Sequence, residues 1–231
     1  MSEKNKVVNE GIQANSIRAE VLAVGHGARA IQTIANSDHR NVSEEIVKIL
    51  VVFANPLGTD ILRLGKEDSI IHQCIKRSLY RDKIHIDIQH AASIHDLRRA
   101  LLEEEYRIVH FSGHGTGSGL SLENEDGDVQ IILPDALASL LSAYAPPLEC
   151  VILNACYSNI HSNLLLSLGV PYTIATEGPL SDDAAIEFTR GFYDAVGAGK
   201  SIKFAHEEGC RAITLAGYST SQFPILLSLK K

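Results

Sequence analysis

The sequence predicts a doubly wound α/β fold, with a mostly parallel six-stranded sheet, helices on both faces of the sheet and a short N-terminal leader. Two observations support this prediction. Six apolar or alternating segments are separated by stretches whose apolar residues recur at helical spacing, and such alternation is typical of parallel sheets. The body that contains them has about 180 residues, enough to bury a sizeable core without disulfide bonds.

The first strand is predicted at 47–53, a nearly unbroken apolar run that stops at Asn55-Pro56, as expected for a central strand covered on both faces. The segment 84–88 alternates strictly between apolar and polar residues, which indicates a strand near a sheet edge. The other strands are expected at 109–111, 151–155, 171–176 and 223–229. A hairpin is expected at 119–132, because Asp126-Gly127 favours a tight turn.

Helices are predicted between these strands. Ser93, followed by Asp96, resembles a short capping box, and Pro134 suits the first turn of a helix that Pro146-Pro147 ends. The apolar faces that predict the remaining helices are Ile71, Cys74, Ile75 and Leu79; Leu164 and Leu168; Ala185, Phe188, Phe192 and Val196; and Ile202, Ala205 and Ile213.

The N-terminal segment has a different pattern, because Ile12, Ile17 and Leu22 recur every five residues, a period of neither helix nor strand. The repeat is either accidental or the mark of a segment that docks on a partner, since repeat units bury their faces against a neighbour. The predicted division is a leader at 1–34, a polar linker at 35–45 and a folded domain at 46–231.

Charge and composition exclude several classes of function. The net charge of −7 and the absence of a basic cluster argue against a nucleic-acid partner. No apolar stretch approaches the ~20 residues of a membrane span, so we expect a cytoplasmic protein with no membrane contact. The four cysteines form no C-x-x-C pair, which favours a reducing compartment and predicts neither a metal site nor a cofactor.

Two of the predicted strands end in residues with chemical function. One apolar run breaks into glycines on both sides of His114, and the run at 151–155 ends at Cys156. Because neighbouring parallel strands present their carboxyl ends to one crevice, the imidazole and the thiol should meet there. His110 lies within its strand and is expected to be a hydrogen-bonded core residue instead.

A thiol that attacks a carbonyl must lose its proton, and the developing oxyanion needs hydrogen-bond donors. His114 can accept the proton, and a helix expected directly after Cys156 would favour the thiolate through its dipole. Glycine at 115 would let a backbone amide approach the substrate oxygen. The structural alternative for Cys156 is a buried thiol without chemical function, which is the interpretation we give to Cys74, Cys150 and Cys210.

Two motifs resemble the CHAT-domain family of caspase-like (clan CD) cysteine peptidases: His-Phe-Ser-Gly-His-Gly at 110–115 and Leu-Asn-Ala-Cys-Tyr-Ser at 153–158. The segments 179–185 and Phe192-Tyr193 support the resemblance. The resemblance covers roughly 46–229 and implies a caspase-like fold and a cysteine endopeptidase acting on proteins. It implies a His114–Cys156 dyad without an obligate third member or a cofactor, and oxyanion donors at the amides of Gly115 and Cys156. It also implies an effector in bacterial defence or stress signalling, activated by a partner protein through residues 7–34.

The segment Ser181-Asp182-Asp183 resembles the place where separase and CHAT peptidases keep the acid of their primary specificity pocket. The resemblance implies cleavage after arginine, with lysine second, and favours Asp182 over Asp183 as the pocket acid. A structural alternative exists, because Ser181 is a good helix N-cap and carboxylates in a first turn are favoured by the helix dipole.

Two other functions remain open. The first is a catalytically silent CHAT-fold interaction module, against which the intact His114 and Cys156 count. The second is a flavodoxin-like nucleotide-binding domain, in which 113–119 would cradle a phosphate. That glycine-rich segment lacks the lysine and the following helix of a P-loop.

Overall fold

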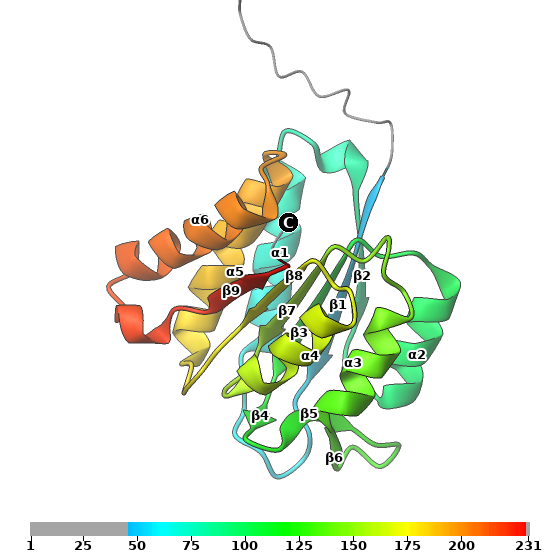
Figure 1. Ribbon diagram of the computed structural model, residues 1–231. Coiled ribbons are helices and arrows are strands. Elements are labelled where there is room, and N and C mark those ends of the chain that lie inside the picture. The colour runs from blue at the N-terminus through cyan, green and yellow to red at the C-terminus, as the bar shows by residue number, and fades with distance from the viewer. Residues whose placement is uncertain (1–45, 230–231) are drawn as a thin grey trace, which may run out of the picture. The chain divides into compact units, whose positions relative to one another are not determined.

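The computed structural model describes residues 46–229, which form a six-stranded sheet in the order β2-β1-β3-β7-β8-β9 (Figure 1). The strands are β1 (Val47–Ala54), β2 (Ile84–Gln89), β3 (Ile108–Gly113), β7 (Cys150–Asn154), β8 (Tyr172–Ala175) and β9 (Ile225–Ser228). All neighbours are parallel except β8 and β9, which are antiparallel. The predicted mostly parallel sheet is confirmed, and β2 lies at its edge as expected.

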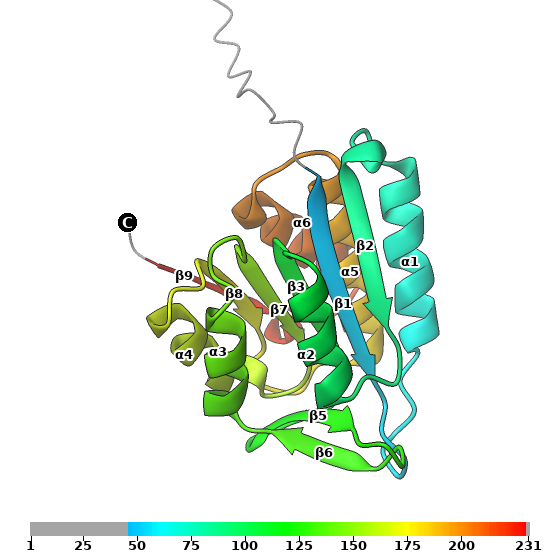
Figure 2. The ribbon, with the colours of Figure 1, turned by 90° about the vertical axis from the view of Figure 1, so that its right-hand side faces the viewer.

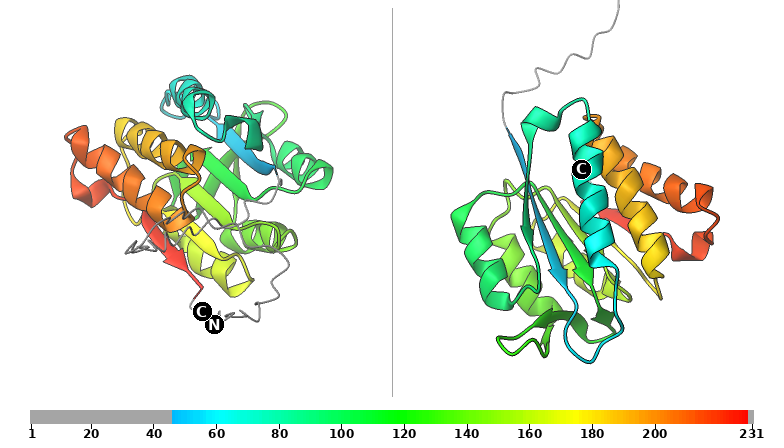
Figure 3. Two further views of the ribbon diagram at one scale, coloured as in Figure 1. Left: turned by 90° about the horizontal axis from the view of Figure 1, so that it is seen from above. Right: turned by 180° about the vertical axis from the view of Figure 1, so that it is seen from behind.

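Helices cover both faces of the sheet (Figures 2 and 3). One face packs against α1 (Leu64–Arg77), α5 (Asp182–Gly197) and α6 (Ile202–Leu215), and the other against α2 (Ile94–Glu103), α3 (Pro134–Ser142) and α4 (Ser162–Ser167). Three short 3₁₀ helices occur at η1 (Arg81–Lys83), η2 (Ser158–His161) and η3 (Thr220–Gln222). Because side chains alternate along a strand, Val109 joins the apolar cluster of the α2–α4 face and Ile108 that of the α1–α5–α6 face.

Local sequence signals position several of these helices. The capping box before α2 is present: Ser93 Oγ accepts from the Asp96 amide at 3.2 Å, and the Asp96 carboxylate accepts from the Ser93 amide at 3.0 Å. Pro134 occupies the first turn of α3. Ser181 caps α5, accepting from the Ala184 amide at 3.3 Å. These helix starts follow from the sequence alone.

A second, antiparallel sheet is inserted between β3 and α3. It consists of β4 (Gly115–Thr116), β5 (Gly119–Glu123) and β6 (Val129–Ile132), and it lies beyond the carboxyl ends of β1 and β2 (Figure 2). The predicted hairpin is confirmed, with Gly127 at φ 81° in its turn. Since 113–119 leads into this sheet and not into a helix, the segment does not form the phosphate cradle of a P-loop.

Three expectations differ from the structure. The helix pattern was expected to extend to Leu79, but α1 ends at Arg77 and Leu79 is exposed. Leu168 was likewise expected on a helix face, but α4 ends at Ser167 and Leu168 is exposed. No α-helix begins directly after Cys156: Tyr157 adopts a left-handed conformation, φ 54°, the four-residue η2 follows, and α4 begins only at Ser162. The helix-dipole argument for the thiolate is therefore wrong.

The predicted leader at 1–34 and linker at 35–45 lie outside the described residues. Within 46–229, none of the helices has the length and apolar composition needed to cross a membrane.

Candidate active site

The strand register brings His114 and Cys156 to the same edge of the sheet. β3 and β7 are parallel neighbours, and their last paired residues are Ser112 and Asn154. His114 and Cys156 each follow two residues later. The structure thus places both predicted dyad residues just beyond the carboxyl ends of adjacent central strands, the usual location of sites in this kind of sheet.

The glycines around His114 allow its loop to fit between two strand ends. A Cβ atom added at Gly113 would lie 2.6 Å from the carbonyl oxygen of Ala54, and one added at Gly115 would lie 2.3 Å from that of Cys156. Real Cβ atoms are not found so close to backbone oxygens. The Gly-His-Gly motif therefore holds the histidine loop against the backbone of the cysteine.

The imidazole of His114 is oriented by a backbone group. Its Nε2 donates to the carbonyl oxygen of Asp60, in the loop between β1 and α1, at 2.8 Å. Because a carbonyl can only accept, the proton of the neutral ring resides on Nε2. Nδ1 is then left as the ring nitrogen that can accept a proton.

The thiol of Cys156 lies against the loop between β8 and α5. Its Sγ is 3.3 Å from the amide nitrogen of Leu180, which donates to it, and 3.6 Å from the carbonyl oxygen of the same residue. These two backbone contacts hold the sulfur against the β8–α5 loop.

Cys156 also differs from the other cysteines in its burial. Cys156 is partly exposed, whereas Cys74, Cys150 and Cys210 are buried. Burial raises the pKa of the Cys74 thiol to about 12 and that of Cys210 to about 11, and it raises the pKa of Cys150 as well. The three buried thiols are thus poor nucleophiles at neutral pH.

The two predicted specificity carboxylates lie at this edge too, in the first turn of α5, and both bind Arg63. Arg63 Nε donates to Asp182 Oδ2 at 2.7 Å, its amide donates to Asp182 Oδ1 at 3.3 Å, and its Nη2 donates to Asp183 Oδ1. The guanidinium lowers the pKa of Asp183. The acidic site is therefore filled by a basic side chain of the same chain.

A model of the CHAT domain matches residues 14–213. The chain belongs to the CHAT family. A Roc-COR-CHAT protease from an unknown prokaryotic organism is 26% identical over 194 residues, which cover 79% of this CHAT chain and 18% of that protein. The chain thus corresponds to a small part of that relative's length, and its match to the family model begins within the predicted leader.

Solved structures share the fold of this CHAT domain. The Drosophila initiator caspase Dronc has a TM-score of 0.55 and 10% identity over 90% of this chain and 92% of its own. The Arg-specific cysteine proteinase gingipain R has a TM-score of 0.57 and 10% identity over 80% of this chain and 47% of its own. A secreted C11 cysteine protease from Bacteroides thetaiotaomicron has a TM-score of 0.54 and 12% identity over 80% and 66%. The predicted caspase-like fold is confirmed.

His110 is buried in the CHAT domain, as its position within a strand predicted. The residue is 1% exposed, its Nδ1 lies 3.0 Å from the hydroxyl of Tyr193, and the two rings stack. Burial lowers the pKa of His110 to about 3, so the ring is neutral at physiological pH. His110 is therefore a core residue of β3.

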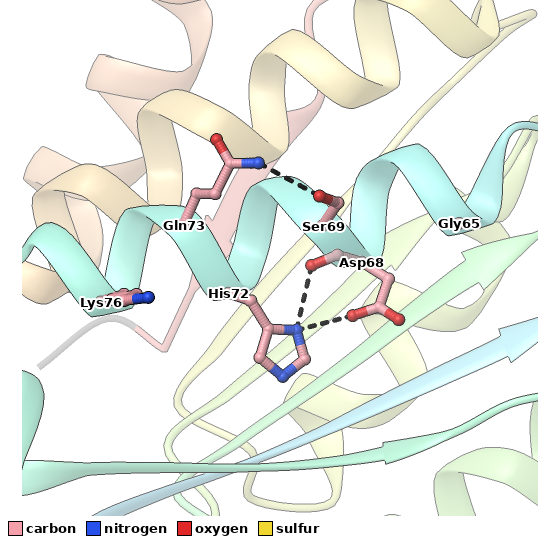
Figure 4. A pocket seen from close by; sticks show the side chains of 6 residues that line it. All are labelled: Gly65, Asp68, Ser69, His72, Gln73 and Lys76. Carbon is pink, nitrogen blue, oxygen red and sulfur yellow. Dashed lines mark hydrogen bonds and ion pairs between the residues drawn. The ribbon is translucent and has the colours of Figure 1, made fainter.

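Two surface hollows differ in their relation to the dyad. One is lined only by residues of α1, where His72 pairs with Asp68 and Gln73 donates to Ser69 (Figure 4). The other borders the β8–α5 loop and includes Thr176 and Gly178. Only the second adjoins the loop that contacts Cys156.

Sequence reasoning missed the groups that hold the dyad in place. The Asp60 carbonyl and the Leu180 amide act through the backbone, so their side chains carry no signal. Arg63 was also missed, because it precedes an amphipathic helix and its partner Asp182 is 119 residues away. The flanking glycines were the only sequence signal for these close backbone contacts.

Proposed function

We propose that this CHAT domain is a cysteine endopeptidase, with Cys156 as nucleophile and His114 as general base and acid. The observation that carries the proposal is the close contact of the His114 loop with Cys156: Gly115 abuts the Cys156 carbonyl, and the Asp60 carbonyl fixes the ring through Nε2. The arrangement leaves Nδ1 free for proton transfer, which a metal-free acyl-transfer site requires.

The reaction follows from these positions. His114 Nδ1 accepts the proton of the Cys156 thiol, and the thiolate attacks the carbonyl carbon of the scissile peptide bond. The oxyanion formed is stabilised by the amides of Gly115 and Cys156. The tetrahedral species collapses as Nδ1–H protonates the leaving amine, which breaks the C–N bond and leaves a thioester. Water, deprotonated by Nδ1, then hydrolyses the thioester and regenerates the thiol.

Substitution of the dyad tests the proposal. Cys156→Ala and His114→Ala should each abolish cleavage of a protein substrate, identified by mass spectrometry of a digested bacterial lysate, without changing the circular dichroism spectrum. Full activity in either variant would exclude the dyad. A thiol alkylator should label Cys156 before Cys74, Cys150 and Cys210, given their burial. Preferential labelling of another cysteine would favour the silent interaction module.

We further propose cleavage after arginine, with lysine second. The carboxylates of Asp182 and Asp183 lie in the loop-to-helix segment that begins at Leu180, the residue in contact with the Cys156 sulfur. They already bind one guanidinium, that of Arg63, so their geometry suits a second. A substrate arginine would replace Arg63 at Asp182, the less exposed of the two carboxylates.

The proposed biological setting is an effector of bacterial defence or stress signalling, in the cytoplasm, activated by a partner protein that contacts residues 7–34. The Roc-COR-CHAT relative carries its CHAT region within a much longer protein, which supports control by other domains. Deleting residues 1–34 should leave a folded domain with basal cleavage but no response to the activating partner. Precipitation of the shortened chain would instead place the leader in the core.

A further inference from the structure

A buried carboxyl group lies beneath the dyad and has no role in the reaction described above. Glu67 of α1 is only 1% exposed. Its carboxyl group accepts hydrogen bonds from Ser112 Oγ of β3, from Asn154 Nδ2 of β7 at 2.8 Å and from Thr189 Oγ1 of α5 at 2.6 Å. We refer to these four residues as the Glu67 cluster.

Fold stability alone does not explain the Glu67 cluster. Among residues 46–229, the basic nitrogen that faces this carboxyl group is His110 Nε2 at 3.6 Å, and that ring is neutral because its pKa is lowered to about 3. Burial of an acid without a cationic partner costs several kcal/mol, and apolar residues of similar volume usually stabilise such a position better. Burial also raises the pKa of Glu67.

The strand register suggests what the cluster does. Ser112 and Asn154 are the last paired residues of β3 and β7, so the backbone ladder between the two strands ends with them. Beyond this pair, His114 and Cys156 follow on separate loops, about 7 Å further along the strands. A single carboxyl group thus joins the side chains of the last pair at the point where the backbone ladder between the two strands ends.

We propose that Glu67 is a positioning residue, whose carboxyl group joins the ends of β3 and β7 and so sets the distance between His114 and Cys156. The proposal rests on the proposed function of the dyad. Glu67 contacts neither Cys156 nor His114 and acts through Ser112 and Asn154. Loss of the bridge would let the two strand ends separate, and a displacement of about 1 Å can lower a rate about 100-fold.

The test removes the acceptor altogether. In Glu67→Leu the apolar side chain of similar volume can bind neither strand, so kcat for a fluorogenic arginine peptide should fall about 100-fold with KM unchanged. The alkylation rate of Cys156 at neutral pH should fall as well, because a more distant His114 withdraws less of the thiol proton. This second readout needs no substrate, so it remains informative even if the wild-type chain cleaves no peptide.

A matched pair of hydroxyl deletions separates positioning from stability. Ser112→Ala and Thr189→Val each remove one hydroxyl donor to Glu67. Ser112 belongs to a dyad strand, whereas Thr189 belongs to α5 and meets the dyad strands only by accepting from Asn154 Nδ2 at 3.3 Å. We expect Ser112→Ala to lower kcat about 10-fold and Thr189→Val less than twofold, at similar losses of thermal stability. Equal effects of the two variants on kcat would overturn the proposal.

Two other results would also overturn it. Full kcat and full Cys156 alkylation in a folded Glu67→Leu variant would show that the bridge is dispensable. A rise in KM for the arginine peptide, with unchanged kcat and unchanged KM for a leucine peptide, would show that Glu67 touches the substrate and belongs to the specificity pocket.

Discussion

The acidic pair Asp182–Asp183 and the buried Glu67, both at the carboxyl edge of the sheet, are held in opposite ways, although both lie near the start of α1. Asp182 and Asp183 bind Arg63, which precedes α1, with side chains that are 25%, 45% and 46% exposed. Glu67, one turn further along α1, is buried and binds three donors from three different elements. The first group faces solvent, and the second faces the interior.

The difference separates exchangeable contacts from permanent ones. An exposed ion pair contributes about 0–1 kcal/mol, because water and salt compete with each partner. In the proposed function, a substrate arginine would therefore replace Arg63 at little cost. Buried hydrogen bonds to a carboxyl group leave unsatisfied donors when broken, at about 1–3 kcal/mol each, so the Glu67 cluster persists through the catalytic cycle. The proposed roles in specificity and in positioning thus fall to neighbouring sites of different burial.

The largest expected effect concerns stability. Glu67→Ala should lower the free energy of unfolding by about 3 kcal/mol, because three buried donors lose their acceptor. Asp182→Ala should change it by less than 0.5 kcal/mol, about the size of most surface substitutions. Urea unfolding of the two variants measures this contrast, and equal losses would remove the distinction between the two groups.

A smaller effect is expected on substrate choice. Asp182→Ala should lower kcat/KM for an arginine peptide about 10-fold, which corresponds to about 1.4 kcal/mol, and leave a leucine peptide unaffected. Arg63→Gln, the matched control, should lower KM for the arginine peptide about threefold, because the internal competitor is gone. A panel of peptides that differ only before the cleaved bond provides both values. Preference for aspartate, or an unchanged arginine preference in Asp182→Ala, would exclude the pocket.

The smallest effect is a pH dependence. Burial raises the pKa of Glu67 above its ordinary value of 4.5, and this outweighs the hydrogen bonds from Ser112, Thr189 and Asn154, which lower it. The charge of Asp182 adds to the rise, while His110 and Tyr193 nearby remain neutral. Folding therefore favours the protonated acid, and stability is lost as pH rises from 4.5 through the raised pKa. Urea unfolding across this range should show a decline in the wild type that Glu67→Gln lacks. A parallel decline in both proteins would assign the pH dependence to other groups.

The sequence predicted the parts of this molecule that depend on local pattern. Strand order along the chain, the capped helices and the hairpin all follow from apolar periodicity and turn residues. His114 and Cys156 were predicted because glycines and a strand end mark them. Glu67 was not, since a glutamate in the first turn of an amphipathic helix has the pattern of a solvated charge.

Arg63 could not be predicted either, because its role depends on contacts between residues far apart in the sequence. Its partners follow β8, whereas Arg63 precedes α1, so only the folded sheet brings the two loops together. Asp60 and Leu180 act through main-chain atoms, which every residue possesses. Long-range pairs and backbone contacts therefore required the structure, whereas residues with distinctive chemistry at strand ends did not.

The assembly of the site from distant strand ends also determines when the protein can become active during its synthesis. The proposed base, the proposed nucleophile and the Leu180 amide follow β3, β7 and β8 in turn, so a growing chain contains all of them only after residue 180 has left the ribosome. A parallel sheet forms these non-local contacts late and slowly. A nascent chain that has not yet reached Leu180 therefore lacks part of the site, and the proposed proteolytic capacity arises together with the native sheet.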